Sequence, residues 1–220
     1  MPSSYRLPLF PLPLVLLPGA LQPLHIFEPR YRRLLADALD GNRQFGIICR
    51  SPDVAERELP TGTVGCVGRI ESSQQLPDGR ANVLVAGTER FVLRSFVDDP
   101  SPYHVALVDP FIDRAATQDD EQEVATRVRT LFTRVGQAAR AIQEDRTALP
   151  TLPAAPALLS FAIAQFVDLA TNDKQRLLSS DSALDRLRQL EEALARMVES
   201  LEQRAYVHAR ARSNGHGAVE

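Results

Sequence analysis

Tryptophan is absent from this chain of 220 residues, lysine occurs once, and aromatic residues make up only 6% of it. Surfaces that bind nucleic acid bases by stacking on aromatic rings are therefore disfavoured. Residues 1–110 hold 11 arginines against 12 acidic residues, and residues 111–220 hold 14 basic against 16 acidic residues. Because a protein that grips a phosphate backbone usually carries a basic stripe, this even distribution of charge argues against nucleic acid as a partner.

Cysteine and uninterrupted apolar runs are also scarce. Cys49 and Cys66 are 17 residues apart with no histidine between them, so the paired ligands of a zinc site are missing. Buried free thiols are the simpler interpretation, and a disulfide stays open only for an exported protein. Five prolines interrupt the apolar segment from Leu7 to Leu24, which argues against a signal peptide and a membrane-spanning helix. We therefore expect a cytoplasmic protein that does not bind membranes.

The motifs that would identify an enzyme are missing. The sequence has no G-x-x-x-x-G-K-[ST] phosphate loop, no G-x-G-x-x-G fingerprint, no H-E-x-x-H and no G-x-S-x-G. The four histidines are isolated in sequence, and Asp98 and Asp99 stand before a proline, as in a turn. We therefore expect no catalytic residues, no metal and no cofactor, and a protein that is not an enzyme.

The first half of the chain has the pattern of a β-rich fold. Thirteen of the 16 prolines lie at or before Pro110, and they separate short β-type runs. The predicted strands are Leu7–Leu12, Leu21–Ile26, Phe45–Cys49, Thr63–Ser72, Arg80–Val92 and Tyr103–Phe111. Pro77-Asp78-Gly79 predicts a hairpin turn, and the three glycines between Gly62 and Ile70 indicate bends or close backbone approach. One helix is predicted at Glu28–Leu39, with Pro29 in its first turn.

The second half has helical periodicity. The predicted helices are a long one from about residue 118, followed by Ala157–Ala170, Lys174–Leu178 and Ser182–Arg212. The second of these is apolar almost all round, so we expect it to be buried. Leucines from Leu184 to Leu201 form a seam that favours the core of a bundle over an oligomer interface. The sequence thus predicts an α+β protein with a β-rich lobe at residues 1–116, an all-helical lobe at 117–212 and a flexible tail at 213–220.

Short motifs occur in a fixed order along nearly the whole chain. The first are LPLFPL at Leu7–Leu12, LPGA at Leu17–Ala20 and LHIFEPRY at Leu24–Tyr31. Later ones are FGII at 45–48, GTVG at 62–65, GRI at 68–70, LPDGR at 76–80, G-x-x-R-F at 87–91 and KQRLL at 174–178. In this order they resemble the N-terminal, substrate-binding domain family of Lon protease. The resemblance spans about residues 5–205 and implies a PUA-like pseudo-barrel followed by a helical bundle.

The resemblance also implies a function. It suggests a bacterial, non-catalytic module that binds unfolded or specific polypeptides, with an adaptor role in protein quality control, and without the ATPase and peptidase parts of Lon. Such binding could use an exposed strand edge or an apolar groove. An RNA-binding module is the alternative, because PUA-like barrels often bind RNA, and a cryptic hydrolase is the third hypothesis. The partner and the oligomeric state stay open.

Candidate residues for peptide binding are positional. The region where the second strand meets the first helix and the end of the hairpin supply His25, Phe27, Glu28, Arg30, Tyr31, Arg90 and Phe91. Each has a plainer interpretation. Phe27, Tyr31 and Phe91 would belong to the core, His25 would make a structural hydrogen bond, and Glu28 and Arg30 would mark a solvated helix start.

Overall fold

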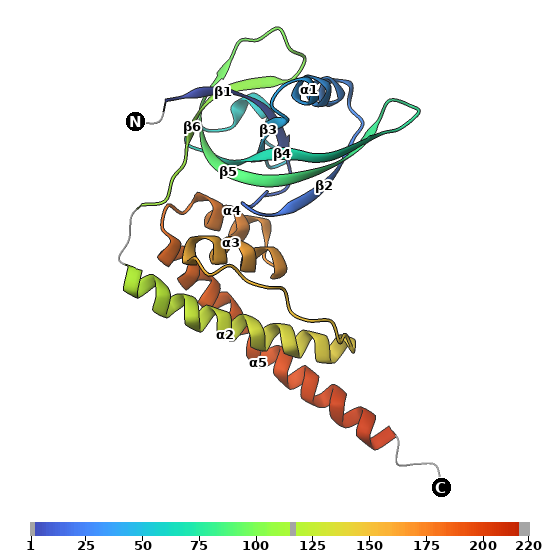
Figure 1. The fold of residues 1–220 in the computed structure, drawn as a ribbon, viewed down its shortest axis with the longest axis vertical. Helices are drawn as coiled ribbons and strands as arrows, with labels where there is room; N and C mark the ends of the chain where they lie inside the picture. The colour runs from blue at the N-terminus through green and yellow to red at the C-terminus, as the bar shows by residue number, and fades with distance from the viewer. Residues whose placement is uncertain (1–2, 115–117, 216–220) are drawn as a thin grey trace. The chain divides into compact units, whose positions relative to one another are not determined.

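The computed structural model describes residues 3–114 and 118–215, and it divides the chain into two compact units (Figure 1). The first unit combines Met1–Arg114 with Ala164–Asp181, and the second combines Ala115–Ile163 with Ser182–Glu220. This division differs from the predicted lobes, because helix α4 (Thr171–Ser179) groups with the sheet. The physical reason is visible at Gln175, whose side-chain amide donates a hydrogen bond of 2.9 Å to the carbonyl oxygen of Val64 in the sheet.

Six strands form one sheet in the first unit. They are β1 (Tyr5–Leu12), β2 (Leu21–Ile26), β3 (Gln44–Cys49), β4 (Val64–Gln75), β5 (Ala81–Val97) and β6 (His104–Pro110). Their order is β2-β5-β4-β3-β1-β6, and β6 also pairs with β5, so five strands close into a barrel. The β1–β3 pair is parallel and the other pairs are antiparallel. The predicted α+β class, with a β-rich part followed by a helical part, is confirmed.

Strand β5 is long enough to pair with two strands along one of its edges. Its first half, Ala81–Ala86, pairs with β2, and its second half, Phe91–Val97, pairs with β6. Strand β4 occupies the other edge of β5. Figure 1 shows the β4–β5 hairpin extending beyond the rest of the sheet, with β2 beside it. In the described part of the chain β2 therefore has β5 as its only strand partner.

The interior of the barrel is packed around one phenylalanine. Phe91 is fully buried, together with Leu7, Leu9, Ile48 and Val108 among others. A Cβ atom at Gly65 would lie 2.4 Å from the Phe91 ring and 2.7 Å from the carbonyl oxygen of Ile47. The glycine is therefore needed for the close approach of the Phe91 ring to the β4 backbone, as the glycine-rich run indicated.

Local signals in the first unit agree with the structure. Helix α1 (Pro29–Asp40) follows Glu28 and buries Tyr31, Leu34, Leu35 and Ala38. At the predicted hairpin turn Gly79 has a φ of 80°, a conformation that favours glycine, and its N–H donates to the Leu76 carbonyl. The short 3₁₀ helix η1 (Glu56–Glu58) was not predicted, because one turn of helix has no apolar periodicity.

The second unit consists of helices. They are α2 (Gln118–Gln143), most of α3 (Pro156–Phe166) and α5 (Ala183–Gly215). Ion pairs from Arg127 to Glu191 and from Arg134 to Glu202 show that α2 and α5 run parallel. Leu187, Leu190 and Leu194 are buried, so the leucine seam belongs to the interior of this unit. Helix α5 continues to Gly215, into the predicted tail, and residues 216–220 lie outside the described residues.

A buried arginine of the second unit has hydrogen-bond and aromatic partners inside that unit. Arg186 is fully buried, its Nε donates a hydrogen bond of 2.9 Å to the Ser160 hydroxyl, and its guanidinium lies 4.4 Å from the centre of the Phe161 ring.

Helix α3 is less buried than its composition predicted, because Leu158 and Phe166 are each 57% exposed. None of the helices within residues 3–114 and 118–215 has the combination of length and apolar composition that a membrane crossing requires.

The packing of Phe91 on Gly65 predicts a strong effect of one added methyl group. Gly65→Ala should lower the free energy of unfolding by about 1–3 kcal/mol, because both the ring and a backbone oxygen would have to move. Gly136→Ala in α2 is the comparison. The new Cβ atom would meet only the end of the Leu149 side chain, which can rotate away, and alanine favours the helix, so this variant should lose less stability. Urea denaturation of both variants measures the difference, and equal stabilities would contradict this view of the barrel.

Candidate functional site

Strand β2 presents an unpaired backbone edge. The carbonyl oxygen of Ala20 accepts a hydrogen bond of 2.8 Å from the N–H of Gly87, so residue 20 faces β5. Because backbone groups alternate in direction along a strand, Gln22, Leu24 and Ile26 also face β5. The N–H and C=O groups of the residues between them, Leu21, Pro23 and His25, then point away from the sheet. Proline at position 23 fits this assignment, since its missing N–H would fall on the unpaired edge.

The same alternate residues expose their side chains. Leu21 is 61% exposed, Pro23 and His25 are exposed, and Phe27, which follows the strand, is 60% exposed. His25 and Phe27 stack with their ring centres 6.2 Å apart. We call these four residues the β2 face. It combines three apolar side chains with one ring that can form hydrogen bonds.

His25 is held in place by the neighbouring strand. Its Nδ1 donates a hydrogen bond of 2.8 Å to the side-chain oxygen of Asn82 on β5. The plainer interpretation of His25 was a structural hydrogen bond, and the partner of that bond is the Asn82 side chain. This bond leaves Nε2 available for a further hydrogen bond. A shallow groove of about 440 Å³ crosses this region and is lined by Pro23, His25 and Asn82 together with Leu84 of β5 and Gln74 of β4.

A second groove lies at the start of β2. It has a volume of about 370 Å³ and is formed on one side by the segment from Val15 to Gln22 and on the other by Ala164–Phe166 and Lys174. Gln165 connects the two sides, because its side-chain amide donates a hydrogen bond of 3.3 Å to the Pro18 carbonyl. We call it the Lys174 groove. It lies wholly within the first unit and shares Leu21 with the β2 face.

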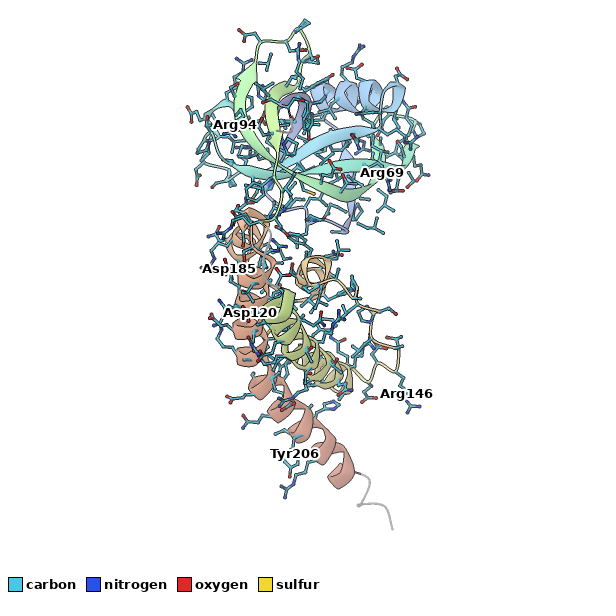
Figure 2. All side chains as sticks on the ribbon, turned by 60° about the vertical axis from the view of Figure 1, so that its left-hand side comes forward. Arg69, Arg94, Asp120, Arg146, Asp185 and Tyr206 are labelled. Atoms are coloured by element: carbon cyan, nitrogen blue, oxygen red, sulfur yellow. The ribbon has the colours of Figure 1, made fainter. Side chains whose placement is uncertain are left out.

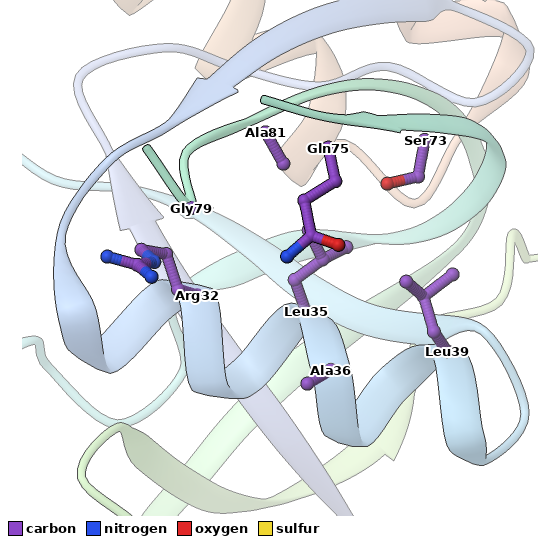
Figure 3. A pocket seen from close by; sticks show the side chains of 8 residues that line it. All are labelled: Arg32, Leu35, Ala36, Leu39, Ser73, Gln75, Gly79 and Ala81. Atoms are coloured by element: carbon purple, nitrogen blue, oxygen red, sulfur yellow. The ribbon is translucent and has the colours of Figure 1, made fainter. Parts of the chain in front are cut away.

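A third cavity lies between α1 and the β4–β5 hairpin (Figure 3). Its volume is about 200 Å³, and Arg32, Leu35 and Leu39 of α1 face Ser73 and Gln75 of β4 across it. A Cβ atom at Gly79 would lie 2.1 Å from the Arg32 guanidinium, so Arg32 is packed against the hairpin turn. This small cavity holds no large exposed apolar side chain.

Three of the predicted peptide-binding residues belong to a charged network around Glu56. The Glu56 carboxylate accepts hydrogen bonds of 2.7 and 2.8 Å from the Arg30 guanidinium, 3.0 Å from the Tyr31 hydroxyl and 3.0 Å from Nε2 of His104. Glu28 pairs with Arg30 at 3.0 Å. The Tyr31 ring is buried, as its plainer interpretation predicted. Arg30 and Tyr31 thus fix η1 against α1, and His104 fixes it against β6. The sequence did not indicate this role, because Glu56 belongs to no recognisable motif.

Burial and charge set the pKa values in this network. Burial alone would raise the pKa of Glu56, but hydrogen bonds from Arg30 and Tyr31 outweigh it and hold that pKa below its ordinary value. Burial raises the pKa of Tyr31 and lowers that of His104, although Glu56 partly offsets the effect on His104. The network is therefore most stable with Glu56 ionised and His104 neutral.

Arg90 and Phe91 are inside the first unit. Arg90 is only 6% exposed and donates hydrogen bonds of 2.8 and 2.6 Å to the carbonyl oxygens of Leu178 and Ser180. It also pairs with Asp113 and lies 4.7 Å from the centre of the Phe111 ring. Phe91 is 0% exposed. Neither side chain presents a surface to a polypeptide, and Arg90 instead fixes the C-terminal end of α4 to the sheet.

The structure therefore stacks the exposed rings of His25 and Phe27, whereas the other five predicted residues either belong to the Glu56 network or are buried. It adds Leu21, Pro23 and Asn82 beside them, and Lys174 in the adjoining groove that shares Leu21. Pro23 was the signal that could have identified the edge from sequence, because proline inside a strand indicates an edge strand. In residues 3–114 and 118–215, no three or more His, Cys, Asp or Glu side chains are grouped so that they could hold a metal ion.

Comparisons with known proteins point to one family. The family model described as the ATP-dependent protease La (LON) substrate-binding domain matches residues 6–196. Lon protease of Trichlorobacter lovleyi is 26% identical over 212 residues, which cover 94% of this chain and 26% of that protein. Lon protease of Anaeromyxobacter dehalogenans is 29% identical over 210 residues, or 89% of this chain and 24% of that protein. The chain thus spans about a quarter of the length of these relatives.

Two solved structures have the same fold. A Lon N-terminal domain protein from Xanthomonas campestris is 26% identical with a TM-score of 0.59, and the match covers 84% of this chain and 96% of that one. The N-terminal domain of Lon protease from the Mycobacterium avium complex is 18% identical with a TM-score of 0.68, and the match covers 87% and 98% of the two chains. Both matches extend over most of each chain.

The Glu56 network predicts a pH-dependent contribution to stability. Glu56→Gln should lower the free energy of unfolding at pH 7 by about 1–3 kcal/mol, because Arg30 loses its charged partner in a half-buried site. Since the folded pKa of Glu56 lies below the ordinary 4.5, the wild-type contribution is complete above pH 4.5 and is lost as the pH falls through the folded pKa. The free energies of unfolding of the wild type and of Glu56→Gln should therefore converge as the pH falls through the folded pKa of Glu56.

The neighbouring carboxylate offers a matched control. Glu58→Gln removes the same charge from an exposed residue of the same 3₁₀ helix. Thermal unfolding between pH 3 and pH 7 measures all three proteins. A gap between wild type and Glu56→Gln that stays constant over this range would show that the carboxylate charge does not matter.

Proposed function

The chain belongs to the LON substrate-binding domain family, and from that premise we propose that it binds polypeptides as an added strand along β2. The observation that supports this mode is the unpaired edge of β2 beside exposed side chains. A polypeptide in extended conformation pairs its backbone with such an edge and places alternate side chains on the neighbouring surface. His25 and Phe27 are the contact residues of this proposal, with Leu21 and Pro23 beside them.

The unpaired edge of β2 offers only a few backbone groups to a bound polypeptide. Leu21 and His25 offer N–H donors and carbonyl acceptors, whereas Pro23 offers a carbonyl alone, to which the Gln22 side-chain amide already donates at 3.0 Å. Proline on an edge strand hinders continuous pairing with other chains. We therefore expect weak and reversible capture of extended segments rather than association of one copy with another. Such binding suits an adaptor that passes polypeptides to a separate protease in the cytoplasm.

The proposal includes no chemical step on the bound polypeptide. On the β2 face the histidine hydrogen-bonds to an amide, and no serine, threonine or cysteine is among its four residues. RNA binding is not favoured, because exposed arginines of the sheet are neutralised in pairs. Arg69 pairs with Glu71 and Arg94 with Asp109, and Figure 2 labels both arginines on the sheet unit.

The first test compares folded and unfolded forms of one polypeptide. Reduced, carboxamidomethylated ribonuclease A should bind the chain, and native ribonuclease A should not, because its segments are not free to pair. Phe27→Ala should weaken binding about tenfold through the loss of apolar contact. Ile112→Ala is the matched control, since Ile112 is 67% exposed but lies outside the β2 face. Fluorescence anisotropy measures the affinities, and equal loss in both variants would contradict the proposed site.

A second test separates the backbone edge from the side chain. His25→Ala removes the ring but keeps the outward N–H, whereas His25→Pro removes both. Strand addition predicts that His25→Pro binds unfolded ribonuclease A about tenfold more weakly than His25→Ala, because the polypeptide carbonyl opposite loses its donor. Both variants should unfold at similar temperatures, since this N–H does not pair with β5. Equal affinities of the two variants would rule out pairing at this edge.

A further inference from the structure

Two of the large exposed apolar side chains of the first unit meet at the Lys174 groove. Leu21, at the first residue of β2, and Phe166, at the end of α3, are 61% and 57% exposed. Both line the groove, together with Val15 and Leu16. Its volume of about 370 Å³ is at the small end of ligand pockets, which span roughly 300–1,000 Å³. The space therefore suits one or two side chains of a larger ligand.

The charge in this groove belongs to Lys174, for which the described residues offer no acidic partner. Lys174 is the only lysine of the chain and is half-buried. In the part of the chain that the structure describes, none of the ion pairs involves Lys174, and the neighbouring Asp173 pairs with Arg176. Its backbone N–H is used in the first turn of α4, where it donates to Ala170. A partly desolvated ammonium group beside apolar side chains is stabilised when a ligand brings a carboxylate to it.

We propose that the Lys174 groove takes a bulky apolar residue of the bound polypeptide while Lys174 pairs with an acidic residue two positions away, on the same face of the bound strand. The inference rests on the proposed function and specifies which segments are preferred. Leu21 belongs to both the unpaired edge and the groove, so a strand that pairs with β2 passes the mouth of the groove at that residue. The β2 edge then provides affinity without regard to sequence, and the groove provides selectivity.

The experiment uses three fluorescein-labelled peptides of 13 residues, built from serine, threonine and asparagine. Each has one central leucine, and the residue two positions later is glutamate, glutamine or lysine. The wild-type chain should bind the glutamate peptide about fivefold more tightly than the glutamine peptide, and the lysine peptide most weakly, as expected for a single solvent-accessible ion pair. The differences should shrink in 0.5 M salt.

Charge reversal tests the assignment to Lys174. Lys174→Glu should reverse the order of the three peptides, and Lys174→Gln should abolish the preference. Arg32→Glu is the matched control, because it makes the same change of charge in the same unit but beside the other cavity, shown in Figure 3. That variant should keep the wild-type order. A preference that shifts equally in Lys174→Glu and Arg32→Glu would come from net charge and would overturn the inference.

The outcomes for the groove and for the β2 edge are distinguishable. If all peptides bind, His25→Pro weakens all of them, and Lys174→Glu leaves their order unchanged, polypeptide binding stands and the groove assignment falls. If neither the peptides nor unfolded ribonuclease A binds to the wild-type chain, both the proposed function and the groove assignment fall. Replacing the central leucine by serine should weaken binding to the level that pairing with the β2 edge provides alone, and equal affinity of the serine and leucine peptides would contradict an apolar groove.

Discussion

The structure of the first unit depends on how β5 shares its two edges. One edge is covered by β4 alone, whereas the other is divided between β2 and β6. Because β6 also pairs with β1, the second half of β5 closes the barrel, and β2 is left beside it with one partner. Closure removes most strand edges of the barrel from solvent. Two edges stay unpaired by strands: that of β2 and that of the outer part of β4, Ser72–Gln75, which pairs with β5 alone. Of the two, the β2 edge is the one flanked by large exposed apolar side chains.

Buried polar contacts maintain this arrangement and determine which residues are available for binding. Arg90 fixes the C-terminal end of α4 to the sheet, and Glu56 fixes η1 against Arg30, Tyr31 and His104. These charges are satisfied within the protein, so they have little left to offer a ligand. The β2 face and Lys174 differ, because the side chains of the former are exposed and the latter is paired with no acid among the described residues. The unpaired edge of β2, the β2 face and Lys174 thus adjoin one another on the first unit, because Leu21 belongs to both the β2 face and the Lys174 groove.

Local features of the fold could be predicted from sequence, and long-range ones could not. The bounds of β2, the hairpin turn at Gly79 and the start of α1 follow from proline, glycine and apolar periodicity, which act over a few residues. The order of the strands depends on contacts between distant residues, so the free edge of β2 was not foreseen. For the same reason the sequence does not show that Arg90 is buried by partners across the fold, and it leaves Phe91 open between a binding and a core role. Pro23 was the one local sign of the edge.

The central claim is that an extended polypeptide pairs with the outward backbone groups of β2. Hydrogen exchange of single backbone amides, followed by NMR with and without unfolded ribonuclease A, tests it most directly. The account predicts that the amides of Leu21 and His25 exchange rapidly in the free protein and at least about tenfold more slowly in the complex. The amide of Leu24, which faces β5, should be protected in both. Unchanged exchange at Leu21 and His25 with saturating polypeptide would contradict the account.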